Sequence, residues 1–371
     1  MSRVFTLVKS ELGPLAFTLG CGLIGGFVFN YFRMPLPWML GAMCVVTALA
    51  LSGARVRVQP WLRQPMIVVI GVMLGSAFTP EILEHAGEYL ISLVLLAVYV
   101  ILAAATSIIF LWKVGRFDPV TAYFSGIPGG LMEMAILGSS VGADDRKIFL
   151  THGTRVFLVV LTIPFWIRLV EGYTPRSGTA VGTAIPTVPL DDLAILTVCA
   201  VAGYFIAKAL KFPAYRLTGP LALSALAHMT GLTASKPPGE LIVLAQLVLG
   251  SIVGCRYLGV RLQDVLGTIR IALGSALILI ASAVAFSYAV HTVAGVQSQA
   301  LLLSLSPGGV VEMTLIALSL GIDVAFVTVH HLARIALTIL VAPLAFRAMR
   351  GSFGIRPTGN GESGAQRGGP A

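Results

Sequence analysis

The chain has 371 residues, of which 57% are hydrophobic and only 11% are charged, and its formal net charge is +9. Soluble domains carry charge on about 25% of their residues. The composition therefore excludes an ordinary soluble protein and predicts an all-α protein that crosses a membrane many times. We attribute the positive charge to Lys and Arg on the cytoplasmic side of the membrane, and we expect no nucleic-acid partner.

Apolar segments follow one another along the chain, and a linker rich in Gly, Pro, Thr and Ser at 171–191 divides them into two sets. We expect a first membrane repeat at 1–170, a second at 192–350, and a disordered tail at 351–371. The expected segments are 13–32, 36–53, 65–79, 89–112, 119–140 and 147–168, then 192–210, 217–233, 240–256, 268–292, 298–320 and 325–347.

The fifth segment of each half is interrupted by Pro-Gly-Gly and then carries a glutamate, once at 125–134 and again at 304–313. Proline removes a backbone donor and glycine favours non-helical dihedral angles, so each segment is predicted to be two short helices with a break between them. A membrane tolerates such a break only where the freed backbone is buried in protein or lines a wet cavity. We expect a functional site at the breaks; the structural alternative is two tight turns that let helices cross closely.

The two halves resemble each other in sequence. Residues 125–168 and 304–347 match at fifteen of forty-four positions without a gap, and the matches include Pro, Gly, Glu, His, Asp and Arg. Hydrophobicity alone does not select such residues. An earlier patch also matches, because Gly25, Pro35 and Gly41 correspond to Gly203, Pro213 and Gly219. We therefore predict an internal duplication.

The charged loops predict that the two halves have opposite orientations in the membrane. The loop before the fourth segment is acidic in the first half, at 81–88, and basic in the second, at 256–270. Because Lys and Arg favour the cytoplasmic side, these equivalent loops are expected on opposite sides. Opposite orientation requires an odd number of crossings, so each half is expected to have five crossings and a re-entrant Pro-Gly-Gly segment, with both termini cytoplasmic. The alternative is six crossings per half and parallel repeats.

We expect a substrate-binding site where the two breaks meet. A helix that begins after Pro-Gly-Gly directs unpaired N–H groups and a positive dipole end into the protein, which favours an anion. Glu133 and Glu312 follow each break within one turn, where a carboxylate either stabilises the helix dipole or binds protons or a cation. The expected site residues are Ser125, Pro128, Gly129, Gly130, Glu133, His152, Arg155, Ser304, Ser306, Pro307, Gly308, Gly309, Glu312, His331 and Arg334.

His152 and Arg155 lie three residues apart and share a helix face, and His331 and Arg334 repeat this spacing. A cation inside a membrane helix is costly unless it is paired or close to water. In one interpretation the arginines form structural ion pairs with the two glutamates. In the other, the arginines face an anionic substrate and the histidines carry protons.

Other chemistry is not indicated. Asp144 and Asp323 precede the sixth segments and are expected to be helix N-caps. The six histidines show no HxxxH or HExxH spacing, and the chain has no P-loop, no GxSxG motif and no dinucleotide-binding fingerprint. We therefore expect no enzyme activity, no metal and no cofactor.

The duplicated Pro-Gly-Gly-x-x-Glu-Met motif, together with Pro-x-Pro-Trp-x-x-Gly at 35–41, resembles the AbrB-type duplicated bacterial inner-membrane proteins. The resemblance covers roughly residues 13–348, and the patch at 213–219 departs from its counterpart at 35–41. Members of this family are labelled as regulators of AidB expression or as ammonia monooxygenases. The resemblance implies a bacterial inner-membrane location and a role in regulation of gene expression; the residues here do not support a monooxygenase.

Inverted repeats with interrupted helices are the architecture of many secondary transporters. We therefore expect a transporter-like permease that moves a small, anionic solute through a site at the midplane of the lipid bilayer. Proton coupling and homo-oligomerisation are compatible with this function. The alternative is a membrane-embedded regulator of gene expression that keeps the same pocket, moves no solute and does not itself bind DNA.

Overall fold

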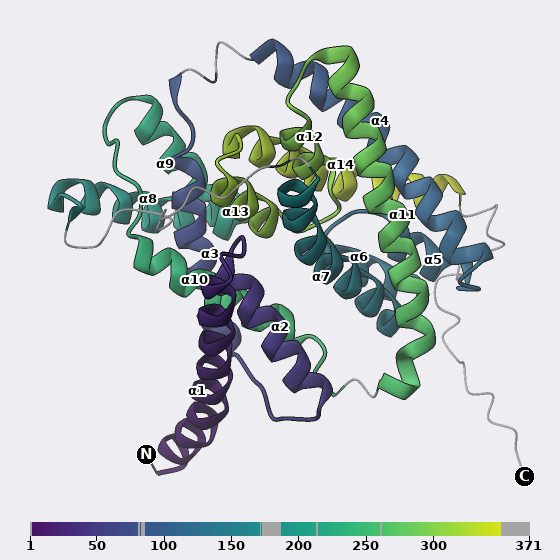
Figure 1. Ribbon diagram of the computed structural model, residues 1–371, viewed down its shortest axis with the longest axis horizontal. Helices are drawn as coiled ribbons and strands as arrows, with labels where there is room; N and C mark the ends of the chain where they lie inside the picture. The colour runs from purple at the N-terminus through teal and green to yellow at the C-terminus, as the bar shows by residue number, and fades with distance from the viewer. Residues whose placement is uncertain are drawn as a thin grey trace, which may run out of the picture.

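The computed structural model describes residues 2–80, 82, 86–170, 172, 187–212, 214–259 and 262–349. The regular elements in these ranges are helices, which confirms the expected all-α class (Figure 1). The expected tail at 351–371 and most of the linker at 171–191 lie outside the described residues, as does half of the acidic loop at 81–88.

The helices follow the expected segments closely. The first half contains α1 (Ser2–Tyr31), α2 (Pro37–Leu51), α3 (Pro60–Gly75), α4 (Ala86–Lys113), α5 (Pro119–Gly126), α6 (Leu131–Ser139) and α7 (Asp145–Leu169). The second half contains α8 (Leu190–Ala209), α9 (Tyr215–Met229), α10 (Gly239–Cys255), α11 (Leu262–Ala294), α12 (Ser298–Leu305), α13 (Val310–Leu320) and α14 (Val324–Met349).

Six of the described helices are long and apolar enough to cross a membrane: α1, α4, α7, α8, α11 and α14. Helices α2, α3, α9 and α10 are shorter, with 15 to 17 residues each. A bilayer core of about 30 Å needs about 20 helical residues. The chain is thus a membrane protein whose long helices occupy equivalent places in the two halves.

The starts of the helices have simple local causes. Pro60 is the first residue of α3, five residues before the apolar run expected at 65, because proline is well suited to the first turn of a helix. Asp144 accepts a hydrogen bond from the backbone of Lys147, and Asp323 accepts one from the backbone of Phe326, at 3.1 and 2.9 Å. The two predicted N-caps are therefore confirmed.

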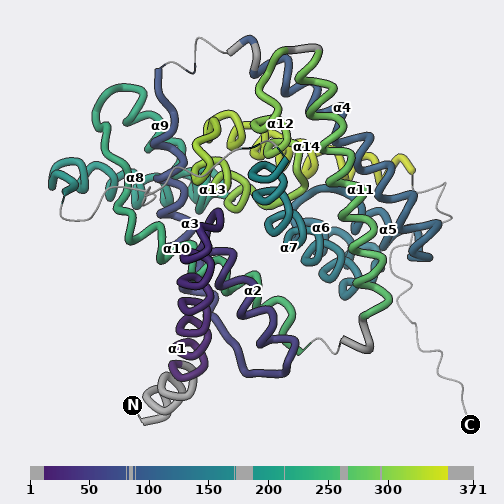
Figure 2. The backbone as a smooth tube through the Cα atoms, in the orientation of Figure 1, coloured from purple at the N-terminus to yellow at the C-terminus, as the bar shows by residue number. Residues whose placement is uncertain are grey.

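The helices pack into two bodies, and each body draws on both halves of the sequence (Figures 1 and 2). The outer body contains α1, α2, α3, α8, α9 and α10. The inner body contains α4 to α7 and α11 to α14. Helix α3 connects them, because it packs against α13 and α14.

Most packing pairs have a counterpart in which the two halves are exchanged. Helix α2 packs on α10 as α9 packs on α3, and α7 packs on α11 as α14 packs on α4. Helices α3 and α10 pack on each other, as do α4 and α11. This exchange is the pattern that an approximate two-fold axis between the halves produces.

The direction of the helices distinguishes inverted from parallel repeats. Tyr99 of α4 donates to the carbonyl of Leu279 at 3.3 Å and its ring lies 5.3 Å from that of Phe286. Two turns later on α4, the Ser107 hydroxyl lies 2.8 Å from that of Ser275, which is earlier on α11. The equivalent helices α4 and α11 are therefore antiparallel. This direction fits the inverted arrangement and contradicts the alternative of parallel repeats.

Glycines allow the closest approaches within the outer body. Gly25 of α1 lies against Gly41 of α2, and a Cβ on either would overlap the backbone of the other. Gly203 of α8 and Gly219 of α9 make the same contact in the second half. The glycines of the early matching patch are thus explained by helix packing, which is the usual role of small residues between membrane helices.

Candidate functional site

The first Pro-Gly-Gly segment is a helical hairpin. Helices α5 and α6 pack against each other, and the backbone N–H of Asp144, just after α6, donates to the Thr121 hydroxyl on the first turns of α5 at 2.8 Å. The chain therefore returns to the place where it entered, as the re-entrant prediction requires. Eight or nine residues rise about 12–14 Å, so the tip lies about halfway across a hydrocarbon core of about 30 Å.

The second segment repeats this construction with α12 and α13, of eight and eleven residues, packed against each other. The hairpins follow α4 and α11, which are antiparallel, so they enter the inner body from opposite ends. Arg155 of α7 and Arg334 of α14, each bound to one break, are close enough for their positive charges to act on each other, and both act on Tyr99.

Arg155 binds the break of the first hairpin. Its Nη1 donates to the carbonyl of Ile127 at 3.1 Å, and its Nη2 donates to the carbonyl of Gly129 at 3.3 Å. These are carbonyls that the interrupted helix leaves without a helical partner. The side chain is only 3% exposed. Its guanidinium therefore offsets the free-energy cost of burying these carbonyls away from water.

Arg334 does the same at the second break. Its Nη1 and Nη2 donate to the carbonyls of Ser306 and Gly308, both at 2.6 Å. Among the described residues, neither arginine forms an ion pair with Glu133 or Glu312. The interpretation of arginine–glutamate ion pairs is therefore wrong, because the backbone of the break occupies the guanidinium instead.

The two buried histidines are held in one tautomer. Arg155 Nη2 lies 2.8 Å from Nδ1 of His152, and Arg334 Nη2 lies 2.9 Å from Nδ1 of His331. A guanidinium can only donate, so each Nδ1 accepts and each Nε2 carries the proton. The Nε2–H groups then donate to the carbonyls of Phe124 and Leu303 at 2.9 and 3.0 Å. This geometry suits a neutral imidazole, because a proton on Nδ1 would face a cation.

Each glutamate folds back over the glycine that begins its half-helix. A Cβ on Gly130 would overlap the carboxylate of Glu133, and a Cβ on Gly309 would overlap that of Glu312. Both glutamates are the third residue of their helix, from which a carboxylate reaches the start of the helix. The chain's own carboxylates therefore occupy the helix N-termini at which an anion was expected.

The glutamates are the accessible part of the site. Glu133 is exposed and Glu312 is partly exposed, whereas the arginines and histidines beside them are buried. Arg256, at the end of α10 in the outer body, lies close enough to Glu312 and to Arg63 for their charges to interact. The tip of the second hairpin thus faces the outer body.

The remaining expected residues divide into two kinds. Pro128 and Pro307 are buried at the breaks, and Gly129 and Gly308 lie beneath the side chains of Met134 and Met313. The Ser304 and Ser306 hydroxyls donate to the carbonyls of Ala300 and Leu302 at 2.7 and 2.5 Å, so they complete the helix end rather than face a ligand. The Ser125 hydroxyl has no hydrogen-bond partner among the described residues.

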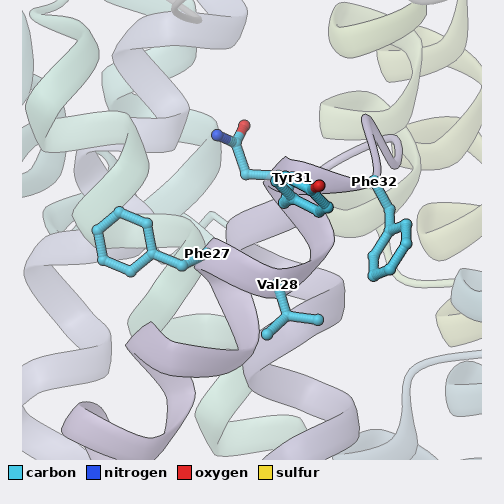
Figure 3. Close-up of a pocket in the computed structure, with 5 residues that line it drawn as sticks. Phe27, Val28, Tyr31 and Phe32 are labelled. Atoms are coloured by element: carbon cyan, nitrogen blue, oxygen red, sulfur yellow. The ribbon is translucent and has the colours of Figure 1, made fainter.

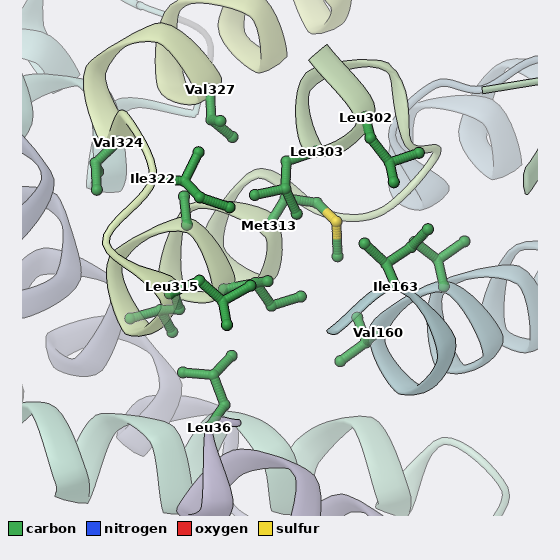
Figure 4. Packing of buried hydrophobic residues seen from close by; sticks show 14 of the residues in the cluster. Leu36, Val160, Ile163, Leu302, Leu303, Met313, Leu315, Ile322, Val324 and Val327 are labelled. Atoms are coloured by element: carbon green, nitrogen blue, oxygen red, sulfur yellow. The ribbon is translucent and has the colours of Figure 1, made fainter. Parts of the chain in front are cut away.

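Apolar side chains enclose the tips. Met313, Leu302 and Leu303 of the second hairpin lie toward Val160 and Ile163 of α7 (Figure 4). All five are fully buried or nearly so. The buried polar groups at the second break therefore lie beside a layer of apolar side chains, where hydrogen bonds and charges act strongly.

Two cavities lie away from the tips. One of about 650 Å³ is lined by Phe27, Val28, Asn30, Tyr31 and Phe32 at the end of α1 (Figure 3). The other, of about 470 Å³, is an apolar hollow between α8 and α9. Both belong to the periphery of the outer body and include none of the expected site residues.

Sequence reasoning missed three residues of the site. Tyr99 and Thr151 are polar groups inside apolar helices, and a polar atom in the middle of a membrane span was the available signal. Arg256 was noted only as a loop charge. Its approach to the second hairpin depends on the packing of α10, which no local pattern reveals.

Taken together, the antiparallel equivalent helices and the two hairpins define a polytopic α-helical membrane protein with a central polar site. The family model described as "Transition state regulatory protein AbrB" matches residues 38–350, so the chain belongs to the AbrB family. It is 26% identical over 347 residues to "Uncharacterized protein YhjN" of Bacillus subtilis (strain 168), covering 88% of this chain and 90% of the relative. It is also 29% identical over 167 residues to "Putative regulator AbrB" of Escherichia coli (strain K12), covering 44% of this chain and 47% of the relative.

Proposed function

We propose that this protein is a permease that carries a small solute across the membrane through a site between the tips of the two hairpins. The observation that supports it most is that Arg155 of α7 and Arg334 of α14 each bind the break of one hairpin, and that the two hairpins enter from opposite ends. Interrupted helices that meet at the midplane are how secondary transporters build solute sites. Neither the construction nor the residues call for a catalytic step, so the proposed function is not enzymatic.

In the proposed mechanism the inner body carries the site past the outer body. The hairpins and both arginines belong to the inner body, and α3 provides its main packing on the outer one. The charge interaction of Arg256 with Glu312 crosses the same boundary. Motion of one packed body against another is a common basis of alternating access.

We assign any proton coupling to the glutamates rather than to the histidines. Glu133 and Glu312 are at least partly exposed and can exchange protons with water. His152 and His331 are buried and each accepts a hydrogen bond from a guanidinium, so protonation would break that bond. The alternative to this assignment, in which the histidines carry protons, stays a prediction.

We place the protein in the bacterial inner membrane with both termini in the cytoplasm, following the distribution of Lys and Arg. Single cysteines at Glu84 and Arg261, in the acidic and basic loops, test this orientation. A membrane-impermeant thiol reagent applied to intact cells should label Glu84→Cys and not Arg261→Cys. Labelling of both variants from the outside would contradict the inverted topology.

A binding measurement tests the permease itself. Purified protein in detergent is heated with organic acids and inorganic anions at two pH values, because a ligand of the folded state raises its thermal stability. We expect a shift that Arg155→Gln removes and that appears as uptake in proteoliposomes. A shift without uptake would indicate a sensor, and no shift and no uptake for any solute would contradict the proposal.

The second candidate function is a membrane-embedded regulator of gene expression. It is favoured by the name of the Escherichia coli relative, which describes a regulator, and by the description of the family. A regulator of this kind needs a cytoplasmic partner surface, for which the 256–270 loop and the 351–371 tail are the candidates. Loss of a regulatory phenotype on deletion of 351–371, with uptake unchanged, would support it.

A further inference from the structure

Two buried hydroxyl groups beside the first hairpin have nothing to bind. The side chains of Ser125 and Thr151 are 0% and 1% exposed, and neither Oγ atom has a hydrogen-bond partner among the described residues. Buried polar groups in proteins are almost always partnered, by protein, by water or by a ligand. These two hydroxyls therefore indicate a partner that the chain does not supply.

Ser125 and Thr151 are two of four buried hydroxyls that lack a hydrogen-bond partner among the described residues; the other two are Thr154, also on α7, and Ser251 on α10. A hydroxyl in a membrane helix usually donates to a backbone carbonyl one turn earlier. Threonines that do so here are Thr18, Thr47, Thr106, Thr162, Thr197, Thr230, Thr314, Thr328 and Thr338. The same local bond is open in principle to Ser125 and Thr151, and neither makes it.

The second half has no such free hydroxyls at the equivalent positions. Ser304, which corresponds to Ser125, donates to the carbonyl of Ala300 at 2.7 Å. His330, which corresponds to Thr151, lies 2.7 Å from the carbonyl of Phe326 and 2.9 Å from the Ser92 hydroxyl. The site is therefore asymmetric, and these two unsatisfied hydroxyls belong to α5 and α7 of the first half.

The hydroxyls lie where the first hairpin meets α7. Ser125 stands between Phe124 and Ile127, whose carbonyls contact His152 and Arg155. Thr151 precedes Arg155 by four residues and so lies on the same face of α7. Ser125 and Thr151 thus belong to the two segments that the Arg155 side chain joins, the first hairpin and α7.

The arginines add two further free donors. The Nε atoms of Arg155 and Arg334 are buried and have no hydrogen-bond partner among the described residues, while their Nη atoms bind the breaks. Within the described residues neither guanidinium has a carboxylate at ion-pair distance. Two buried positive charges with free N–H groups favour a negatively charged ligand.

We propose that the Ser125 and Thr151 hydroxyls, with the Nε–H groups of Arg155 and Arg334, bind one small oxyanion on the side of the first hairpin. The ligand is a carboxylate or an inorganic oxyanion, since both present oxygens that accept several hydrogen bonds at once. This inference rests on the proposed permease and names the class of its solute. The second half contributes Arg334 of α14, and the serines of its hairpin stay bonded to their own backbone.

Thermal-shift titrations of the full-length protein with sodium acetate, succinate, phosphate and sulfate, against chloride at equal ionic strength, test the assignment. We expect one of these anions to stabilise the wild type, with apparent affinity weakened about two- to tenfold in Ser125→Ala and in Thr151→Val, as the loss of one hydrogen bond implies. Thr151→Ser keeps the hydroxyl and should restore binding. Thr328→Val removes a buried hydroxyl that already bonds Val324 and is the matched control.

The possible outcomes distinguish a failure of the oxyanion site from a failure of the proposed permease. If an oxyanion binds or is taken up and Ser125→Ala and Thr151→Val leave its affinity unchanged, the hydroxyls hold water only and the inference is wrong while the permease stands. An equal loss in Ser304→Ala would contradict the asymmetry. Uptake of a neutral or cationic solute, with no response to any of the four anions, would reject the oxyanion class. Absence of uptake for every solute would reject the permease itself.

Discussion

The side chains of Glu133 and Glu312 explain why the last residue of each Pro-Gly-Gly sequence is glycine. Each carboxylate lies directly over the glycine at the start of its half-helix, in space that a methyl group would need. A sequence pattern places glutamate and glycine three residues apart, yet it does not say that one covers the other. The contact shows that both residues serve one local structure, the closed start of a half-helix inside the membrane.

Gly130→Ala should destabilise the protein by about 1 kcal/mol or less, because the added methyl group displaces only the flexible end of the exposed Glu133 side chain. The added methyl group would collide with the Glu133 carboxylate, so the loss should be smaller when Glu133→Ala is already present. Thermal unfolding of both single variants and the double variant measures this coupling. Gly153→Ala is the control, since a Cβ there meets nothing within 4 Å. Equal losses in the two backgrounds would contradict the contact.

The arginines illustrate what the sequence could and could not predict at this scale. The repeated His-x-x-Arg spacing correctly placed His152 with Arg155 and His331 with Arg334 on helix faces that meet the breaks. It could not choose between glutamate and backbone as the partner of the guanidinium. That choice depends on where the freed carbonyls point after the chain turns, which is a property of the folded hairpin.

Arg334→Lys should destabilise the protein by about 1.5–3 kcal/mol for each charged hydrogen bond that is lost, because an ammonium cannot bond the Ser306 and Gly308 carbonyls and Nδ1 of His331 in one plane. Thermal unfolding in detergent measures the loss. Arg347→Lys, on the last turn of the same helix, is the exposed comparison and should change stability little. Equal stability of Arg334→Lys and the wild type would mean that the carbonyl contacts contribute nothing.

At the scale of elements, the apolar segments and the two breaks predicted nearly every helix. The prediction succeeded because proline, glycine and long apolar runs act locally. Opposite charges on equivalent loops predicted the inverted arrangement, and the antiparallel packing of α4 and α11 agrees with it. The sequence did not predict which helices pack together. Helix α2 packs on α10, and α3 packs on α9, through glycine faces whose partners lie far apart in the chain.

A cysteine pair tests the direction of α4 and α11. Ser107→Cys with Ser275→Cys should form a disulfide within one chain under mild oxidation, since the two hydroxyls lie 2.8 Å apart. Ser107→Cys with Ser282→Cys should not, because Ser282 is two turns away along α11, beside Tyr99. Gel mobility with and without reductant reads out the link. A disulfide in the second pair and none in the first would contradict the antiparallel register.

The two bodies of the molecule are defined by helix packing, and they do not coincide with the two halves of the sequence. Each half contributes three helices to the outer body and the rest to the inner one, so both bodies have internal two-fold character. The site belongs to the inner body, and Glu312 and the helix that carries Arg334, α14, face the boundary at which α3 and Arg256 lie. If the inner body carries the site across the membrane, it must be free to slide along its boundary with the outer body.

A covalent link across that boundary should stop transport. The rings of Phe157 on α7 and Tyr257 after α10 lie 5.9 Å apart and belong to different bodies, so Phe157→Cys with Tyr257→Cys can be joined by a short bifunctional reagent. We expect uptake to fall to background on cross-linking and to return on reduction of a cleavable linker. The Ser107→Cys and Ser275→Cys link lies within the inner body and should leave uptake intact. Full uptake with both links in place would exclude sliding of the bodies.

The most direct test is solute uptake by proteoliposomes that contain the purified protein. Acetate, succinate, phosphate and sulfate are each supplied outside as labelled compounds, and uptake is followed with and without a pH gradient. We expect saturable uptake of at least one of them, lost in Arg155→Gln and retained in Thr328→Val, with both variants folded by gel filtration. Uptake by Arg155→Gln equal to the wild type would contradict the site between the hairpins. No uptake of any solute by the folded protein would contradict the permease and leave the regulator as the better description.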